Sequence, residues 1–577
     1  MDNKYLIEKS FRSYLIPSVL SILGGNISIL IDNCVAGTFL GEQSLAAMSI
    51  VNPVFNMITA VGLLIFGGAS TLACVCLGSN DRDKKHVYFT ISLYLALVVG
   101  VVITIGGVLV LSPLISLLGA TGVLASLARD YCRIMFLGSI ALIAIYLPLN
   151  FFRIEGRARM GMLMFLIMSG LDIILDLLLV VVIPLGMTGL ALATVISALV
   201  AVTIVFPKLC NQKWGYHLVP LKNCKREIQQ IIIKGSPLAL GNLYTVIRVR
   251  ILNSLLLSSG GSLALAAYVC ANNINIVGLA FITGISQTVA PIAGVLFGER
   301  DGVGIKHVVR KAATTGVVVT LGFWVLLLAL SQPIAKLFGM NTIQQLQETQ
   351  IAIIILSANL FFVMLSSILT SYYMTCEHTG LANLLTIARG LGFAVIFSFV
   401  GAQLFGTKGV LGGLVLAEMA TLLLALVGAL WLQKHNGDYK GILLLSHKRF
   451  QVGETMMCTT LNTSKSISET ATQTEEFCKN QGLAPKKAMA VSLGVEEIMV
   501  LMSKYALTNE NEYIDLRLVI SSEETVTRIR CGGEWFNPLT FEAEEEFDYM
   551  GVKILLNMAQ DISYSTNLGF NNIKIVI

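Results

Sequence analysis

Long apolar segments separated by short polar loops fill roughly the first three quarters of the chain. A helix needs about 20 apolar residues to span a bilayer, and each of these segments is of that order. The pattern predicts twelve spans, at approximately 13–39, 50–77, 87–112, 126–151, 161–184, 187–207, 231–258, 263–296, 310–333, 349–375, 381–405 and 408–432. We therefore expect an all-α polytopic membrane protein over this region.

The apolar pattern repeats at an offset of 220 residues, and landmark residues repeat with it. The paired positions include Pro17 and Pro237, Gly41 and Gly261, Gly78 and Gly298, Asp81 and Asp301, Gly119 and Gly339, and Gly186 and Gly406. Repeated apolar halves are typical of secondary transporters. The repeat predicts one six-helix bundle over 1–215 and a second over 216–440.

Basic residues gather in every second loop. They include Lys9 and Arg12 before the first span, Lys84 and Lys85 after the second, Arg153 and Arg157 after the fourth, Lys225 and Arg226 after the sixth, Arg300 and Arg310 after the eighth, and Lys434 and Lys440 after the twelfth. The positive-inside rule then predicts that both termini are cytoplasmic and that the two bundles are parallel copies. We expect a multi-pass protein of the cytoplasmic membrane.

Composition agrees with this class. Hydrophobic residues make up 55% of the chain and charged residues 13%, against roughly 25% charged in soluble domains. The net charge of +5 is small and indicates no nucleic-acid partner. The eleven Cys residues show no metal-ligand spacing and read as small apolar packing residues. We expect no cofactor apart from a coupling ion, H⁺ or Na⁺.

After about residue 441 the charge becomes dense and the apolar runs shorten, which predicts a cytoplasmic α+β domain over 445–577. Alternating residues at 513–520 and 525–530 predict two strands joined by a turn at 521–524. Helices are predicted at 484–506, with Pro485 in its first turn, and at 550–560. A closing strand is predicted at 572–577.

Ionisable residues inside spans are costly and commonly face a cavity or a partner. Asp32, followed by Asn33, lies in the first predicted span, and Asp172 and Asp176 lie in the fifth. Because they are four residues apart, Asp172 and Asp176 share one helical face. These four residues predict an ion-coupling site in the first bundle. The alternative is structural: Asp172 could pair with Arg389 and lock two helices together.

The second bundle carries arginines and amides in its spans instead of aspartates. The predicted lining residues of a substrate cavity are Arg248, Asn253, Asn272, Gln287 and Arg389. The same amides would also serve as hydrogen bonds between helices. Phe165 and the methionines near it are expected to pack or to face lipid.

These residues resemble the MATE (multidrug and toxic compound extrusion) family of antiporters. The resemblance rests on Pro17, on Asp32-Asn-Cys-Val-Ala-Gly-Thr-Phe-Leu-Gly41, on Arg153-Ile-Glu-Gly156, on Asp176 and on Gly186-Met-Thr-Gly-Leu-Ala-Leu-Ala-Thr194. It covers residues 10–435 and implies two bundles around a V-shaped cavity. It also implies export of organic, often cationic, compounds in exchange for H⁺ or Na⁺, with Asp32 at the position tied to ion coupling. Arg248 and Arg250 depart from that pattern and leave room for an anionic or zwitterionic substrate.

The C-terminal domain resembles the histidine-kinase-like ATPase fold of anti-sigma-factor kinases. Ala490-Val-Ser-Leu-Gly-Val-Glu-Glu497 and Gly551-Val-Lys-Ile-Leu-Leu556 carry the resemblance, which implies nucleotide-site remnants at Glu496, Glu497, Gly533 and Gly551. Leu501 stands where that family places a Mg²⁺ ligand, so ATP turnover is not expected. A nucleotide or a regulatory protein stays open as the partner of this domain.

The sequence therefore predicts an ion-coupled exporter of small organic compounds, working by alternating access among membrane lipids and not as an enzyme. Two alternatives remain. Arg248 is compatible with a flippase for lipids or lipid-linked sugars. A membrane sensor kinase is remote, because Leu501 interrupts the nucleotide site.

Overall fold

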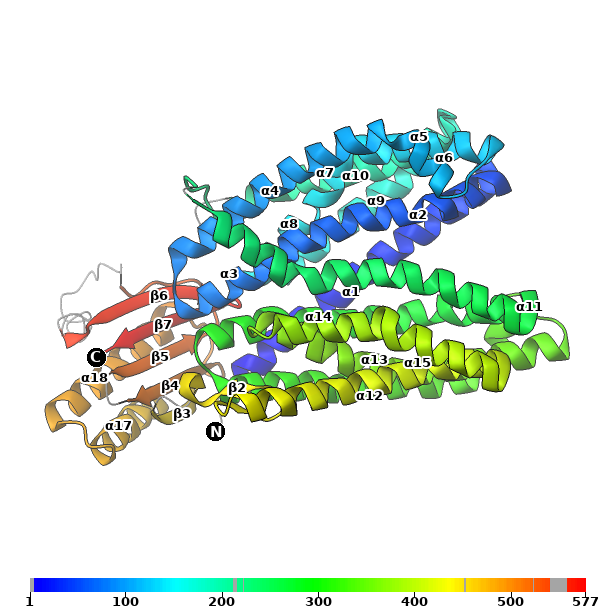
Figure 1. The fold of residues 1–577 in the computed structure, drawn as a ribbon. Coiled ribbons are helices and arrows are strands. Elements are labelled where there is room, and N and C mark those ends of the chain that lie inside the picture. Colours follow the sequence, from blue (N-terminus) through cyan, green and yellow to red (C-terminus); the bar gives the residue numbers. More distant parts are fainter. Residues whose placement is uncertain (1–4, 211–214, 222, 451–452, 522–523, 540–557) are drawn as a thin grey trace.

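The computed structural model describes residues 5–210, 215–221, 223–450, 453–521, 524–539 and 558–577. Figure 1 shows two groups of long helices that diverge from a small sheet domain at one end of the molecule. This is the expected polytopic helical protein with an α+β domain at its C-terminus.

The first group of helices follows the first half of the repeat. Its elements are α1 (Tyr5–Val35), η1 (Ala36–Leu40), α2 (Glu42–Gly62), η2 (Leu63–Gly67), α3 (Gly68–Ser79), α4 (Arg82–Leu109), α5 (Leu111–Leu117), α6 (Gly122–Leu137), α7 (Ser139–Ala144), α8 (Tyr146–Ile154), α9 (Ala158–Asp176), η3 (Leu177–Val182) and α10 (Gly186–Leu209). The η elements are single π-helical turns that continue the neighbouring helices.

The second group consists of fewer, longer helices. They are α11 (Lys225–Gly298), α12 (Gly302–Leu337), α13 (Ile343–Thr375), α14 (Thr379–Ile387), η4 (Ala388–Gly392) and α15 (Phe393–His435). Among the described residues, nine helices are long and apolar enough to cross a membrane, or ten if the bent pair Gly122–Leu137 and Ser139–Ile154 forms one span. Two of these, α11 and the run 379–435, contain a break, at Gly261 and at Gly406. With the bent pair counted as one span, dividing these two helices at their breaks gives twelve, the number of spans predicted.

Glycines place these breaks at equivalent positions of the two halves. Gly41 and its repeat partner Gly261 have φ angles of 86° and 65°, and Gly186 and Gly406 have φ angles of 62° and 57°. L residues with a side chain rarely adopt positive φ, so glycine is the residue that allows the chain to turn there. The repeat seen in the sequence thus has a conformational cause.

Glycines also bring the two bundles into contact at the end that carries the sheet domain. Gly68 and Gly78 on α3 meet α11, where Gly235 and Gly298 lie opposite them. A Cβ atom at any of these four positions would run into backbone of the other bundle. Close backbone approach between helices is the usual reason for small residues at a membrane helix interface. This contact closes one end of the molecule.

Over its described residues, the C-terminal domain consists of a five-stranded antiparallel sheet and two helices. Its strands, in the order β3-β4-β5-β7-β6, are β3 (Glu454–Leu461), β4 (Tyr513–Ile520), β5 (Thr525–Cys531), β6 (Asp561–Asn567) and β7 (Phe570–Val576). Its helices are α17 (Ser464–Asn480) and α18 (Pro485–Tyr505), and the linker forms β1 (Tyr439–Lys440), β2 (Leu445–Ser446) and α16 (His447–Phe450). The predicted strands at 513–520, 525–530 and 572–577 and the helix at 484–506 are confirmed. Most of the predicted helix at 550–560 lies outside the described residues.

The two faces of this sheet meet different partners. Leu516 and Leu518 belong to the core cluster that also contains Val495 and Met499 of α18. Side chains alternate across a strand, so Arg517 lies on the opposite face. In the part of the domain that the structure describes, no helix covers that face; it docks on the closed end of the bundles (Figure 1).

Arginines of the docked face bind the C-terminal ends of one helix from each bundle. Arg528 donates to the carbonyl oxygen of Gly78 at the end of α3, at 3.4 Å. Arg517 donates to the carbonyl oxygens of Glu299 and Arg300 just after α11, at 2.9 and 2.7 Å. The last carbonyls of a helix have no partner within the helix and carry the negative end of its dipole. The sheet therefore caps both bundles at once.

Glu299 supplies the carboxylate at the centre of this interface. It is 4% exposed; its carboxylate pairs with Arg530, lies 3.5 Å from the Arg528 guanidinium and accepts a hydrogen bond from Asn572 at 3.3 Å. Burial lowers the pKa of Arg528 to about 10, which still leaves this guanidinium charged at neutral pH. Glu299 thus neutralises buried positive charge that the sheet brings to the bundles.

Replacing Gly298 by Ala is expected to lower the free energy of unfolding by about 1–3 kcal/mol, because its Cβ would meet the backbone of α3. The measurement is the thermal unfolding midpoint of the purified protein. Gly106→Ala in α4 is the matched control: open space surrounds that position, so Ala should cost nothing there. Equal midpoints for the two variants would contradict the close contact.

Glu299→Gln is expected to destabilise the full-length protein by about 3 kcal/mol or more, because it leaves buried arginines without a counter-charge. Denaturant or thermal unfolding followed by tryptophan fluorescence measures this. Glu469→Gln breaks an exposed pair with Lys465 and should cost less than about 1 kcal/mol. A loss for Glu299→Gln no larger than for this control would refute the docking described here.

Candidate functional site

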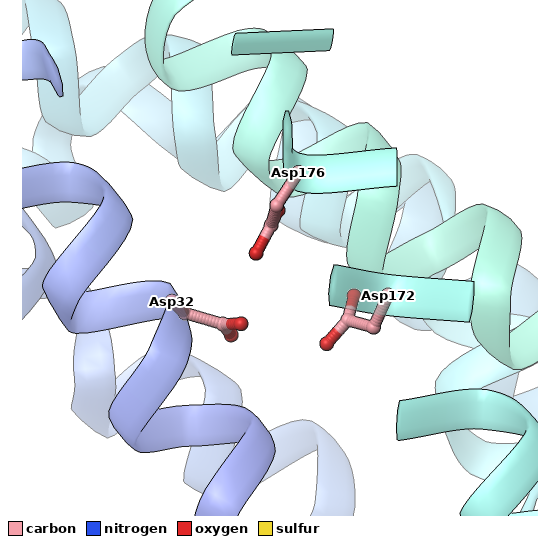
Figure 2. Close-up of side chains that lie close together, drawn as sticks. All are labelled: Asp32, Asp172 and Asp176. Carbon is pink, nitrogen blue, oxygen red and sulfur yellow. The ribbon is translucent and has the colours of Figure 1, made fainter. Parts of the chain in front are cut away.

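Three aspartates of the first bundle converge on one buried point. Asp32 projects from α1, and Asp172 and Asp176 project from α9 toward it (Figure 2). One carboxylate oxygen from each residue lies within 4.8 Å of the others, and all three residues are buried. The four-residue spacing on α9 places its two carboxylates on the face that meets α1.

Irregular helical turns follow both helices close to these aspartates. The π-turn η1 begins at Ala36, four residues after Asp32, and η3 begins directly after Asp176. Single π-turns within α-helices are frequent at functional sites, since each widens the helix locally. Both helices that carry the carboxylate cluster therefore have an irregular backbone close to it.

The three carboxylates are not equally satisfied. Asp172 accepts hydrogen bonds from the hydroxyl groups of Ser28, at 2.6 Å, and Ser197, at 3.2 Å. Among the described residues, Oδ1 of Asp32 and both carboxylate oxygens of Asp176 have no hydrogen-bond partner. Buried carboxylate oxygens without donors are costly. They are the atoms that a proton or a cation would satisfy.

Repulsion between the three carboxylates also favours a bound proton or cation at this point. Two unit charges 4.8 Å apart repel each other by roughly 3 kcal/mol even at an effective dielectric constant of about 20. Three ionised aspartates therefore cannot share this space without a counter-charge. Carboxylate and hydroxyl oxygens suit hard cations, so the cluster could hold either Na⁺ or one or more protons.

The carboxylate cluster borders a cavity of about 580 Å³. Asp32 and Asp172 line it, together with amide, hydroxyl, aromatic and methionine side chains. These include Asn26, Asn33, Asn52, Asn56, Thr59, Asn242, Gln287, Phe55, Tyr131, Tyr146, Phe165, Met48 and Met168. Cavities of roughly 300–1,000 Å³ with apolar walls and a few polar groups are typical of small-molecule sites.

One hydrogen bond joins the two bundles beside this cavity. The guanidinium of Arg153, at the end of α8, donates to the side-chain oxygen of Gln287 on α11 at 2.9 Å. Gln287 therefore lines the cavity, where the sequence predicted it, and also holds the bundles together. Arg153 was noted in the sequence for its loop and its motif, not for this contact.

The arginines predicted for the cavity lie elsewhere. Arg389 pairs with Glu418 at 3.3 Å and donates to Ser367 at 2.8 Å, and Arg248 reaches the carbonyl oxygen of Arg389 at 3.4 Å. Among the described residues, neither arginine lines the cavity. The alternative in which Asp172 pairs with Arg389 is wrong, because Glu418 holds that guanidinium.

Two predicted amides also lie away from the cavity, while other lining residues escaped prediction. Asn253 is half-buried and Asn272 is exposed, and neither lines it. Phe165 does line it, contrary to the expectation that it packs or faces lipid. Asn52 and Asn56 line it too, joined by a 2.9 Å hydrogen bond. Their signal in the sequence is a pair of amides four residues apart within an apolar span.

The nucleotide-site residues predicted for the C-terminal domain are spread over its helix-covered side. Glu496 and Glu497 are half-buried on α18, and Gly533 packs with a φ of 82° against the backbone at the end of α18. Leu501 is buried, so the position of the expected metal ligand is apolar. Gly551 lies outside the described residues. The resemblance to a kinase-like ATPase stays a prediction.

Two repeat-related helical bundles around a polar cavity define a multi-pass membrane transporter. The family model MatE matches residues 17–178 and 237–400, which together make up more than half of the chain. The chain belongs to the MATE family. The two matched segments begin 220 residues apart, which is the offset of the repeat.

Two relatives of this chain are multidrug export proteins. The multidrug export protein MepA of Staphylococcus haemolyticus is 26% identical over 417 residues, which cover 71% of this chain and 90% of the relative. MepA of Staphylococcus aureus is 26% identical over 437 residues, covering 74% and 95%.

Solved transporter structures share the fold of the membrane domain. One, described as the outward-facing conformation of a multidrug resistance MATE family transporter, has a TM-score of 0.69 at 24% identity and covers 75% of this chain and 96% of its own. Another, a transporter of the MOP superfamily from Pyrococcus furiosus, has a TM-score of 0.69 at 25% identity with the same coverage. The description of that structure reports a binding pocket of reverse polarity that suggests a different function.

A cysteine placed in the cavity should be accessible from only one side of the membrane. We expect Asn52→Cys to react with a membrane-impermeant maleimide added on the side opposite the C-terminal domain, because the bundles are closed at the domain's end. The test is made in a Cys34→Ser background, because native Cys34 is exposed, and native Cys74, buried at the closed end, should remain unlabelled. Labelling of Asn52→Cys only from the side of the C-terminal domain would contradict the closure.

Proposed function

We propose that this protein exports small organic cations in exchange for H⁺ or Na⁺, and that the coupling ion binds at Asp32, Asp172 and Asp176. The carrying observation is that Asp32 and Asp172 belong both to the carboxylate cluster and to the cavity wall. A cationic substrate near these carboxylates and a coupling ion among them would compete for the same negative charge. Such competition is sufficient to make exchange of one for the other favourable.

The charge of the cavity supports a cationic substrate. Its described lining residues include two carboxylates and neither Lys nor Arg. Arg248 was the residue that suggested an anionic substrate or a flippase, and it lies with Arg389 and Glu418 inside the second bundle instead. The two relatives named above are multidrug export proteins, which agrees with this assignment.

The basic loops support one orientation of the protein in the membrane. The first turns of α1, the loop after α8 and the loop after α11 are basic, and all three meet the C-terminal domain. Tyr5 contacts Tyr513 with ring centres 4.4 Å apart, Arg157 lies over Trp535 at 4.6 Å, and the Arg300 carbonyl accepts from Arg517. By the positive-inside rule this end is cytoplasmic. The closed end then faces the cytoplasm, and the cavity opens outward.

Alternating access would require the glycine contacts between α3 and α11 to separate. In the outward-open state an external cation enters the carboxylate cluster and displaces the exported compound. The bundles then close around the ion and open at the cytoplasmic end, where ion release restores the negative charge that attracts the next substrate. Each half of this cycle depends on differential binding to the two states.

The test is efflux from proteoliposomes with an imposed pH or Na⁺ gradient, using a panel of fluorescent cations and anions. We expect cations to be transported and Asp32→Asn to abolish gradient-driven efflux, because an amide can neither take up a proton nor neutralise a cation. Gel filtration and unfolding midpoints should show that the variant is folded.

Asp130→Asn is the matched control, since Asp130 is an exposed carboxylate on α6 close in sequence to the lining residue Tyr131. It should retain the wild-type efflux rate. Gradient-driven efflux by Asp32→Asn at the wild-type rate, or transport of anions only, would refute the proposal.

A further inference from the structure

A second cavity, of about 170 Å³, lies where the sheet docks on the closed end of the bundles. The membrane domain and its linker contribute Ser79, Gly298, Glu299, Arg300, Arg449 and Phe450. The sheet contributes Thr455, Arg517, Val519, Ser521, Glu524, Val526, Arg528 and Lys574. This cavity is remote from the three aspartates and plays no part in the transport cycle proposed above.

Positive charge exceeds negative charge around this cavity. Among the described residues, five cationic side chains and two carboxylates line it, an excess of three positive charges, and one of the cations, Arg449, also pairs with Glu377 outside the cavity at 3.0 Å. The cations are Arg300, Arg449, Arg517, Arg528 and Lys574. One carboxylate, that of Glu299, is already held by Arg528, Arg530 and Asn572.

Arg517 shows that the positive charge is not fully used by the protein. Its two terminal nitrogens bind the carbonyl oxygens of Glu299 and Arg300, but its buried Nε has no hydrogen-bond partner among the described residues. The residue is 7% exposed. An N–H of a buried guanidinium is a strong donor, and leaving it without an acceptor is costly. An anion in the cavity would supply that acceptor.

We propose that this cavity binds a phosphate-bearing anion that ties the C-terminal domain to the closed end of the transporter. Arginine favours phosphate because its guanidinium donates several hydrogen bonds in one plane. A cavity of this size accommodates one or two phosphoryl groups, whereas whole drug-sized ligands occupy roughly 300–1,000 Å³. The phosphate could belong to a soluble compound or to a lipid headgroup at the membrane surface.

The site is distinct from the nucleotide-site remnant. Glu496 and Glu497 lie on α18, which covers the face of the sheet that carries Leu516 and Leu518. Arg517 and Arg528 point to the other face, toward the bundles. The ligand is therefore bound at the docking surface and not in the position expected for a kinase-like ATPase.

Because both the membrane domain and the sheet line the cavity, a bound anion stabilises the docked state of the domain. Arg300 and Arg449 come from the membrane side, and Arg517, Arg528 and Lys574 come from the sheet. An anion that contacts both sides binds only when the domain is docked, so by linkage it stabilises the docked state. Because the docked sheet caps α3 and α11 together, the anion also favours the conformation closed at this end. Its concentration would then regulate how often the cytoplasmic end opens.

The experiment measures the unfolding midpoint of the full-length protein with two probes. Potassium pyrophosphate is titrated at constant ionic strength against potassium chloride, and nanodiscs containing phosphatidic acid are compared with nanodiscs of phosphatidylcholine alone. Potassium salts keep Na⁺ away from the carboxylate cluster. We expect at least one probe to raise the midpoint, saturably in the case of pyrophosphate.

The variant is Arg300→Asn with Lys574→Gln, which removes two lining charges and spares the docking contacts. Arg300 docks through its backbone oxygen, and Asn tolerates its positive φ of 58°. Among the described residues, the polar contact of the Lys574 side chain is a 3.8 Å approach to Asp561. Removing each charge-assisted hydrogen bond to the anion should weaken binding by about tenfold. Lys465→Gln with Lys486→Gln, both exposed on the domain, is the control that removes the same amount of charge.

The possible outcomes distinguish a soluble phosphate compound, a lipid headgroup and the absence of an anion site. A rise with pyrophosphate that weakens in the cavity variant and not in the control assigns a soluble phosphate compound. A rise with phosphatidic acid alone, with the same dependence on the variants, assigns a lipid headgroup. No rise with either probe, or the same rise in the cavity variant and the control, overturns the proposal. None of these readouts depends on transport.

Discussion

The rest of the structure depends on the backbone contact between α3 and α11. Glycines on both helices allow this approach, and it closes the two bundles at one end. Once that end is closed, the bundles diverge and the polar cavity lies farther along α1 and α2. The same contact brings the C-terminal ends of α3 and α11 together, which creates the surface on which the sheet domain docks.

The two halves of the internal repeat share their backbone features but differ in their charged residues. Positive-φ glycines and aspartate caps occur at matching positions, with Asp81 capping α4 and Asp301 capping α12. The carboxylates do not repeat: the counterparts of Asp32 and Asp172 are Leu252 and Gly392. Within the second bundle Arg389 pairs with Glu418, and the cationic Arg248 lies beside them against the carbonyl oxygen of Arg389. Ion coupling through the carboxylate cluster would therefore be a property of the first bundle alone.

The sequence was most informative where the physical cause is local. A long apolar run, a glycine at a turn and an aspartate inside an apolar segment each carry their own signal, so the spans, the breaks and the region of the carboxylate cluster were predictable. The sequence did not predict which side chains pair with one another. Arg389 meets Glu418 and not Asp172 because of how the helices are rotated about their axes, which apolar patterning does not specify. For the same reason Arg248, Asn253 and Asn272 fell outside the cavity.

The docking of the sheet on the bundles could not be predicted from the sequence, for a different reason. In β4 and β5 polar residues alternate with apolar ones, and that pattern is the same whether the polar face meets water or another domain. Only the structure shows that Arg517, Arg528 and Arg530 meet the end of α11 and Glu299. The C-terminal domain thus becomes part of the closed state of the transporter and not an appended module.

The central claim is that substrate and coupling ion compete for the charge of Asp32, Asp172 and Asp176. The most direct test is to add tetraphenylphosphonium to the purified protein in weakly buffered solution and to follow released H⁺ with an indicator dye and released Na⁺ with a selective electrode. The account predicts that substrate binding releases one of these cations from the wild-type protein and that Asp32→Asn abolishes the release. Binding that releases neither cation, or equal release from wild type and Asp32→Asn, would contradict it.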